Sequence, residues 1–177
     1  VIELGARYGT VSCAINSKLK NKKNQVSVEP DNTVWDALEF NKTNNNCDFH
    51  ILKGVISNKK LNIKYNGYGT STHRNENKHG DSEILNYTLK NIKEKYNLNF
   101  NVLVSDCEGY LETFLNENPN LYEELDMIIF EEDRQDICNY YLIKKNLKLN
   151  GFKRIAYKGY VTPQNVYSKS VRKADIY

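Results

Sequence analysis

Short apolar runs of strand length alternate with helix-patterned segments along most of this chain. Such alternation is typical of a parallel sheet built from strand–helix–strand units. Core strands are predicted over residues 1–4, 25–28, 49–56, 100–105 and 126–130. Helices are predicted over residues 10–19, from Asn32 through Phe40, over 89–96, from Tyr110 onward and over 137–149. The pattern therefore predicts an α/β fold.

The 177 residues fit one domain of ordinary size, and no linker divides them. Residues 60–65 alternate as a half-buried strand does, and residues 152–157 and 165–171 resemble a closing antiparallel pair. Residues 66–82, which directly follow the half-buried strand, contain no Leu, Ile, Val, Phe or Met and are predicted to form a long polar loop. We predict a single domain over 1–177 whose chain begins inside its first strand.

Composition narrows the class of protein. Hydrophobic residues make up 40% and charged residues 27%, which favours a packed core over disorder. No apolar run is long enough to cross a bilayer, and the four cysteines form no C-x-x-C pair. This argues against a zinc finger and against a disulfide-rich secreted scaffold. An intracellular, cytoplasmic protein without a membrane partner is expected.

The net charge of +3 comes mostly from lysines interleaved with acids. A nucleic-acid site would need clustered Lys or Arg with exposed aromatic residues. We interpret the lysines as a solvated basic surface. The expected acceptor is therefore a small molecule or glycan, and no nucleic-acid partner is expected.

A glycine-containing turn follows the first predicted strand. It reads Glu3-Leu4-Gly5-Ala6-Arg7-Tyr8-Gly9 and lacks the middle glycine of G-x-G-x-x-G, which counts against a dinucleotide pyrophosphate. Glu29 ends the second strand about 20 residues later and can accept both hydroxyls of an adenosine ribose. The alternatives are a simple strand–helix turn and a helix-start acid. Together, the turn and Glu29 favour a nucleoside-type ligand.

Acidic residues also end two later strands, where open α/β sheets bind ligands. Asp106 and Glu108 follow one strand, and Glu131 and Glu132 follow the next. Asp106, Glu131 and Glu132 suggest an oxygen-rich site for Mg²⁺ or Mn²⁺. The alternative for Glu131 and Glu132 is a solvated acidic turn.

The histidines and Cys107 offer weaker signals. His73 lies in the polar loop near Tyr68, and the two could belong either to a lid over an acceptor or to a plain surface loop. His50 lies in a core strand and is expected to be structural. Cys107 has no histidine that can be placed beside it, so we expect it to pack into the sheet.

Several segments resemble the FkbM family of S-adenosylmethionine-dependent methyltransferases. Val28-Glu29-Pro30-Asp31 resembles that family's E-P-x segment, and residues 104–112 resemble its D-x-E-G-x-E signature. Residues 1–12, 50–58 and 128–131 resemble its first motif, third strand and following acid-ended strand. Arg7 and Ser105 depart from the family pattern.

The resemblance implies a Rossmann-like class I methyltransferase fold: a mostly parallel sheet with an antiparallel C-terminal strand and helices on both faces. It implies an O-methyltransferase that uses S-adenosylmethionine and acts on a hydroxyl, commonly of a sugar or glycan. Asp106 is the first candidate for the base, with Glu108 and His73 behind it. The residues expected to bind the cofactor are Glu3, Gly5, Ala6, Tyr8, Gly9, Glu29, Pro30, Val55, Ile56 and Asp106.

Two rival functions remain open. One is an RNA methyltransferase with the same cofactor, which would need a basic channel lined by stacking aromatic residues. The other is a non-catalytic cofactor-binding or interaction domain.

Overall fold

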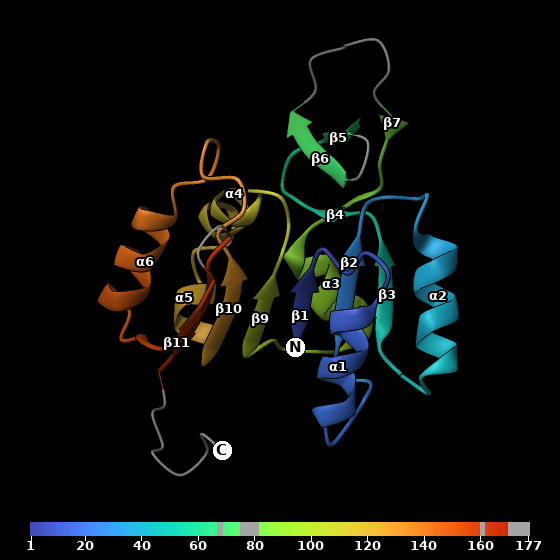
Figure 1. Ribbon diagram of the computed structural model, residues 1–177, viewed down its shortest axis with the longest axis horizontal. Coiled ribbons are helices and arrows are strands. Elements are labelled where there is room, and N and C mark those ends of the chain that lie inside the picture. The colour runs from blue at the N-terminus through green and yellow to red at the C-terminus, as the bar shows by residue number, and fades with distance from the viewer. Residues whose placement is uncertain (67–68, 75–81, 160–161, 170–177) are drawn as a thin grey trace. The chain divides into compact units, whose positions relative to one another are not determined.

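The computed structural model describes residues 1–66, 69–74, 82–159 and 162–169, with only the backbone described between residues 62 and 83. The chain divides into two compact units, residues 1–99 and residues 100–177 (Figure 1). Among the described residues, no helix is both long and apolar enough to cross a membrane.

The first unit is built on three parallel strands, β1 (Ile2–Leu4), β2 (Val26–Glu29) and β3 (His50–Lys53), with β2 in the middle. Helix α1 (Thr10–Lys18) connects β1 to β2, and α2 (Trp35–Asn44) connects β2 to β3. Every residue of β1 and β2 is buried, as expected of parallel strands covered on both faces. This arrangement brings the carboxyl ends of all three strands to one edge.

The predicted strand over residues 49–56 is interrupted at Gly54. Gly54 has a φ of 148°, and a Cβ there would lie 2.3 Å from the carbonyl oxygen of Leu85. The chain turns away at this point, and β4 (Val55–Ile56) pairs in parallel with β8 (Asn86–Tyr87) instead of extending β3. The prediction of one continuous strand is therefore wrong.

The remaining elements of the first unit are β5 (Leu61–Asn66), β6 (Gly69–Arg74), β7 (Ser82–Glu83) and α3 (Leu89–Tyr96). Strand β5 pairs antiparallel with both β6 and β7. The predicted loop over residues 66–82 is thus wrong for Gly69–Arg74, because hydrogen bonds along the backbone form this hairpin without apolar side chains. Tyr68 lies outside the described residues.

The second unit contains β9 (Val102–Ser105), β10 (Met127–Glu131), β11 (Lys153–Lys158) and β12 (Gln164–Ser168). Strands β9 and β10 are parallel, and β12 runs antiparallel between β10 and β11. The predicted antiparallel pair near the C-terminus is confirmed. The strands of the two units follow the mostly parallel order of a Rossmann-like fold, with one antiparallel strand near the C-terminus, which confirms the predicted fold class.

Three helices complete the second unit: α4 (Leu111–Glu117), α5 (Leu121–Glu124) and α6 (Tyr140–Leu149). The sequence patterns did not predict α5, and α6 begins three residues later than expected. Its start is fixed by Asn139, whose side chain accepts a hydrogen bond from the Leu142 amide at 3.0 Å. The Phe130 ring lies 6.0 Å from the rings of both Tyr140 and Tyr167, and this aromatic stack joins α6 to the sheet.

Candidate functional site

The glycine turn after β1 is closed by its own backbone hydrogen bonds. The amides of Gly5 and Ala6 both donate to the carbonyl of Val28 at 3.0 Å, and the Gly9 amide donates to Ala6 at 2.7 Å. Gly5 and Gly9 have φ angles of 86° and 81°, which favour glycine at both positions. Gly9 also lies against Leu38, where a Cβ would come within 2.7 Å of the leucine side chain. The turn therefore packs tightly on α2.

Glu29 ends β2 beside this turn, as predicted. Its side chain is buried, and its two carboxylate oxygens accept hydrogen bonds from the backbone amides of Arg7 at 2.5 Å and Asp31 at 2.8 Å. Burial raises the pKa of Glu29 to about 7 despite these bonds, so the carboxyl changes charge near neutral pH. Glu29 thus holds the turn and the start of the next segment together.

The residues after Glu29 were predicted less well. The helix predicted from Asn32 begins at Trp35 instead, without a side-chain cap. Asp31 instead accepts hydrogen bonds from the amide and hydroxyl of Thr33, at 2.9 and 2.6 Å. Trp35 is half-buried, and its indole N–H donates to the Glu29 carbonyl at 2.9 Å. Asp31 and Trp35 therefore both contact Glu29 from outside the sheet.

The donor and acceptor groups of the turn decide which ligand it suits. A pyrophosphate needs free backbone N–H groups, but the amides of Gly5, Ala6, Arg7 and Gly9 are already bonded within the chain. What the turn offers is a carboxylate beside a half-exposed glycine. Carboxylates accept hydroxyl and ammonium donors, so the residues present fit the ribose and amino groups of S-adenosylmethionine better than the phosphates of a dinucleotide.

Glu3 does not present its carboxylate at the surface. It is 1% exposed, and one of its oxygens accepts hydrogen bonds from the hydroxyls of Ser12 at 2.5 Å and Ser27 at 2.6 Å. The other oxygen is buried without a hydrogen-bond partner in the described part of the chain. Burial raises the pKa of Glu3. The geometry supports a role beneath the turn, joining α1 to β1 and β2, in place of the expected direct contact.

The other predicted cofactor residues of the first unit have mixed environments. Tyr8 is 40% exposed, with the Arg7 guanidinium 4.9 Å from its ring centre, and Pro30 is half-buried. Ala6 packs in a core cluster, so only its backbone belongs to the turn. Val55 and Ile56 follow β3 as expected, but both side chains are buried and their backbone pairs with β8.

In the second unit, the Asp106–Gly109 segment forms a tight turn after β9. Asp106 and Glu108 are both exposed, and Glu108 has a φ of 50°. A Cβ on Gly109 would lie 2.7 Å from Ile137 and 2.9 Å from the Arg134 side chain, so only glycine fits there. The turn is therefore held against the segment that precedes α6, and it leaves Asp106 accessible.

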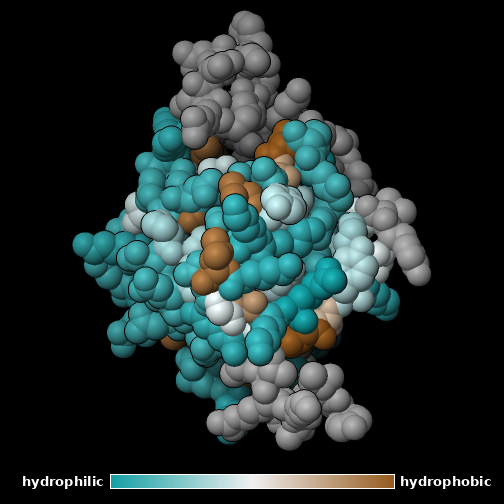
Figure 2. Space-filling view, turned by 90° about the vertical axis from the view of Figure 1, so that its left-hand side faces the viewer, coloured by the Kyte–Doolittle hydropathy of each residue, from teal (hydrophilic) through white to brown (hydrophobic). Residues whose placement is uncertain are grey.

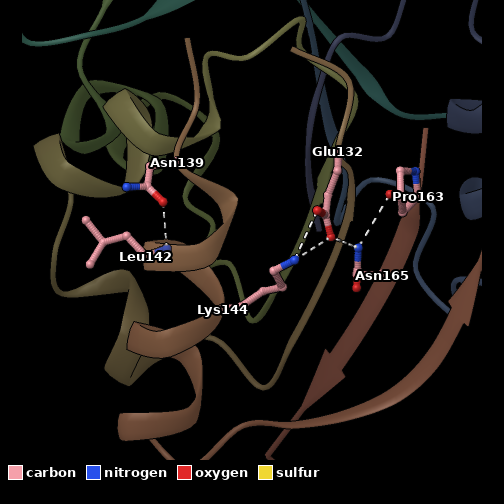
Figure 3. Close-up of polar contacts among 6 residues, drawn as sticks. All are labelled: Glu132, Asn139, Leu142, Lys144, Pro163 and Asn165. Atoms are coloured by element: carbon pink, nitrogen blue, oxygen red, sulfur yellow. Dashed lines mark hydrogen bonds and ion pairs between the residues drawn. The ribbon is translucent and has the colours of Figure 1, made fainter. Parts of the chain in front are cut away.

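The proposed metal ligands are not brought together. The Glu132 carboxylate accepts from the Lys144 ammonium at 3.0 Å through both oxygens and from the Asn165 side chain at 2.6 Å (Figure 3). Glu132 is buried and its bonds run toward α6 and β12. Within the residues that the structure describes, no three His, Cys, Asp or Glu side chains are grouped to hold a metal ion. The prediction of a metal site at Asp106, Glu131 and Glu132 is unsupported, because Glu132 is neutralised by a lysine.

Asp133 forms a polar contact that the sequence patterns did not predict. Its carboxylate accepts hydrogen bonds from the Arg134 amide at 2.5 Å and from the Tyr140 hydroxyl. Burial and the Asp133 charge raise the pKa of Tyr140.

Burial raises the pKa of Cys107 to about 12, and the Cys107 sulfur lies 3.0 Å from the Ser105 hydroxyl. Cys107 is therefore a neutral thiol, in agreement with its expected packing role.

The two remaining histidine predictions differ in outcome. His73 belongs to β6, where its backbone pairs with Asn62, and its side chain lies outside the described residues. His50 begins β3, and its ring stacks on Tyr96 with 4.4 Å between ring centres. Burial lowers the pKa of His50, which agrees with a packed, structural histidine.

Comparisons with known proteins point to one class of fold. No family model matches this chain, and no curated protein does. A precorrin-6y C5,15-methyltransferase from Geobacter metallireducens has a TM-score of 0.57 and 9% identity, over 94% of this chain and 77% of that one. A candidate RNA methyltransferase from Pyrococcus horikoshii has a TM-score of 0.53 and 15% identity, over 97% and 73%.

A candidate tRNA (m1A22) methyltransferase from Streptococcus pneumoniae has a TM-score of 0.54 and 12% identity. The match covers 94% of this chain but 62% of the pneumococcal protein's length. At these identities the likeness shows the fold alone, and membership in the FkbM family is not confirmed.

Proposed function

We propose that this chain is a methyltransferase that takes its methyl group from S-adenosylmethionine. The observation that carries the proposal is the pairing of the Gly5 turn with the buried Glu29 carboxylate at the strand ends of the first unit. When bound, the donor supplies a methyl group on a positively charged sulfur. Glu29 would accept the ribose hydroxyls, and Gly5 would let the methionine portion lie close to the backbone.

A calorimetric titration with S-adenosylmethionine tests this assignment through Gly5→Ala. A methyl group at Gly5 would occupy the space of the ligand, and we expect affinity to fall by about tenfold or more. Gly151→Ala is the matched control, because Gly151 has a φ of 84° and nothing lies within 4 Å of its added Cβ. Equal affinities for the two variants, with both folded, would remove the glycine turn from the site.

The acceptor we propose first is a hydroxyl of a sugar or glycan, as the FkbM resemblance implies. A sugar hydroxyl is a weak nucleophile at neutral pH, so a base must take its proton as the methyl group arrives. Asp106 is our candidate for that base, because it is exposed at the end of β9. Glu108 and His73 are the second candidates. A divalent metal is not part of the proposal, since Glu132 is paired with Lys144.

RNA methylation is the second candidate function, and two observations favour it. Two of the structural neighbours are named as RNA or tRNA methyltransferase candidates. The second unit also carries a groove with several basic side chains, described in the next subsection. A non-catalytic domain would bind S-adenosylmethionine but transfer its methyl group to no acceptor.

Transfer of a labelled methyl group to RNA and to sugar acceptors, followed by mass spectrometry, separates these functions. In whichever reaction is found, Asp106→Asn should keep donor affinity while turnover falls about 10²–10⁴-fold, as loss of a general base does. Asp126→Asn is the control, an exposed aspartate just before β10. Near-normal turnover by Asp106→Asn would exclude Asp106 as the base and direct attention to Glu108 and His73.

A further inference from the structure

Positive charge is concentrated in the last part of the chain. Nine of its 25 Lys and Arg residues follow Asp136, while Asp175 is the one acid among the same residues. The first 136 residues hold 16 basic and 21 acidic residues, so they are net negative although the whole chain is at +3. The expectation of evenly interleaved lysines is therefore wrong for this part of the sequence. A region of one sign creates a field that attracts opposite charge.

The structure gathers part of this charge into a groove of about 730 Å³ between α6 and β11. Lys144, Lys145 and Lys148 line it from one helical face, and Arg154 lines it from the strand. The side of the molecule on which α6 lies is largely hydrophilic, with small separate apolar patches (Figure 2). An open groove with this lining suits an extended anionic chain better than a small apolar ligand.

Most of this charge remains available for a ligand. Lys144 is neutralised by Glu132 at 3.0 Å. Lys145, Lys148 and Arg154 are exposed, and no acidic partner for them is found among the residues that the structure describes. Arg154 lies 5.0 Å over the ring of Tyr157, a contact that holds the guanidinium but leaves its charge uncompensated. Three cations in one groove can therefore contact successive phosphates.

One exposed aromatic ring and one exposed leucine lie beside these cations. Tyr141 lines the same groove and is 77% exposed, and Leu149 at the other end of α6 is 74% exposed. Exposed aromatic rings next to a line of cations are what single-stranded nucleic acid binding requires, since bases stack on the rings while the cations hold the phosphates. A sulfated glycan or an anionic membrane would use the lysines but would not need the Tyr141 ring.

We propose that the groove lined by Tyr141, Lys145, Lys148 and Arg154 binds single-stranded nucleic acid, RNA or DNA. The proposal does not depend on methyl transfer, because binding is measured without S-adenosylmethionine. If the proposed function fails and this inference holds, the chain is a nucleic-acid-binding protein without that activity. If this inference alone fails, methyl transfer to a sugar acceptor is unaffected.

Fluorescence anisotropy with labelled single-stranded RNA and DNA of the same sequence tests the inference. Lys145→Gln with Lys148→Gln should weaken binding about tenfold or more and lower the dependence of affinity on salt. The matched control, Lys18→Gln with Lys20→Gln in the first unit, removes the same net charge from another surface and should change affinity less than about twofold. Equal losses from the two pairs would overturn the proposal in favour of bulk charge.

Tyr141→Ala separates nucleic acid from other polyanions. It should weaken binding to normal strands about tenfold but leave an abasic strand of equal charge unaffected, because only bases stack. Tighter binding of RNA than DNA, or the reverse, identifies which of the two strands the groove prefers. Heparin and phosphatidylserine vesicles are the competing probes. Preferential binding of either one, with no effect of Tyr141→Ala on strand binding, would overturn the assignment.

Discussion

Glu29 combines two demands that conflict. Its carboxylate holds the amides of Arg7 and Asp31, which is a structural task, and it is also the group proposed to accept ribose hydroxyls. Each carboxylate oxygen has two lone pairs, so one backbone bond on each oxygen leaves acceptor capacity for a ligand. Burial raises the pKa of this carboxyl to about 7, although both backbone bonds favour the ionised form.

The pKa of Glu29 predicts a pH dependence of ligand binding. The ionised carboxylate is the better acceptor, so affinity should rise with pH through about 7, by about tenfold between about pH 6 and pH 8. Adenosine is the suitable probe, because it carries the ribose hydroxyls and does not titrate over this range. Calorimetry should give a flat profile for Glu29→Gln. A flat profile for the unmodified chain would show that Glu29 does not bind the ribose.

Glu3 predicts a different pH dependence, in stability. Its pKa is raised by burial, so the folded state binds the proton more tightly than the unfolded chain. The stability that Glu3 contributes is therefore fully present below its unfolded pKa and is lost as the pH rises through the folded one. Glu3→Gln keeps an oxygen for Ser12 and Ser27 and removes the ionisation.

Urea unfolding at several pH values measures this effect. Relative to the unmodified chain, Glu3→Gln should gain stability as the pH rises from below the ordinary glutamate pKa of 4.5 through the raised pKa of the folded state. The gain should be about 1.4 kcal/mol for each unit by which the two pKa values differ. Glu123→Gln, an exposed acid on α5, is the control and should follow the unmodified chain. Parallel curves for Glu3→Gln would mean that Glu3 is not buried as an acid.

At the scale of helices and strands, local sequence patterns predicted which elements are present better than they predicted where each element begins and ends. The period of apolar residues predicted α3 over Leu89–Tyr96. Thr88 and Asn91 form a capping box there, which fixes the first residue of the helix. The start of α2 was predicted too early, because Asp31 bonds to Thr33 in the segment before the helix, and α2 begins at Trp35 without a side-chain cap. The break at Gly54 depends on Leu85, which lies about 30 residues away along the chain. A contact of that kind has no local signal.

The parts of the candidate site that depend on nearby sequence could be predicted, and those that depend on contacts between separate elements could not. Gly5, Gly9 and Glu29 stand at strand ends, and strand ends follow from the alternation of apolar runs. The pairing of Glu132 with Lys144 was not predictable, because it joins the end of β10 to the middle of α6. Three acids near two strand ends suggested a metal, but Glu132 pairs with a lysine twelve residues later along the chain.

At the scale of the whole molecule, the order of elements carried the prediction of the fold. Strands and helices alternate through both units, and the closing antiparallel pair was visible as two separate apolar runs around a Gly/Pro segment. The net charge was misleading about the distribution of basic residues, because +3 is the sum of a negative first part and a positive last part of the chain. Net charge is a sum, and only its distribution along the chain reveals a basic surface.

The hydrogen bonds within the glycine turn have a consequence for the thermodynamics of binding. The Gly5, Ala6 and Arg7 amides are fixed before any ligand arrives, by Val28 and Glu29. A loop that is ordered only on binding loses conformational entropy at that moment, about 1–2 kcal/mol for each residue fixed. This turn has already lost that entropy during folding. Its affinity for a small molecule should therefore report the contacts themselves, with little loss from ordering of the chain.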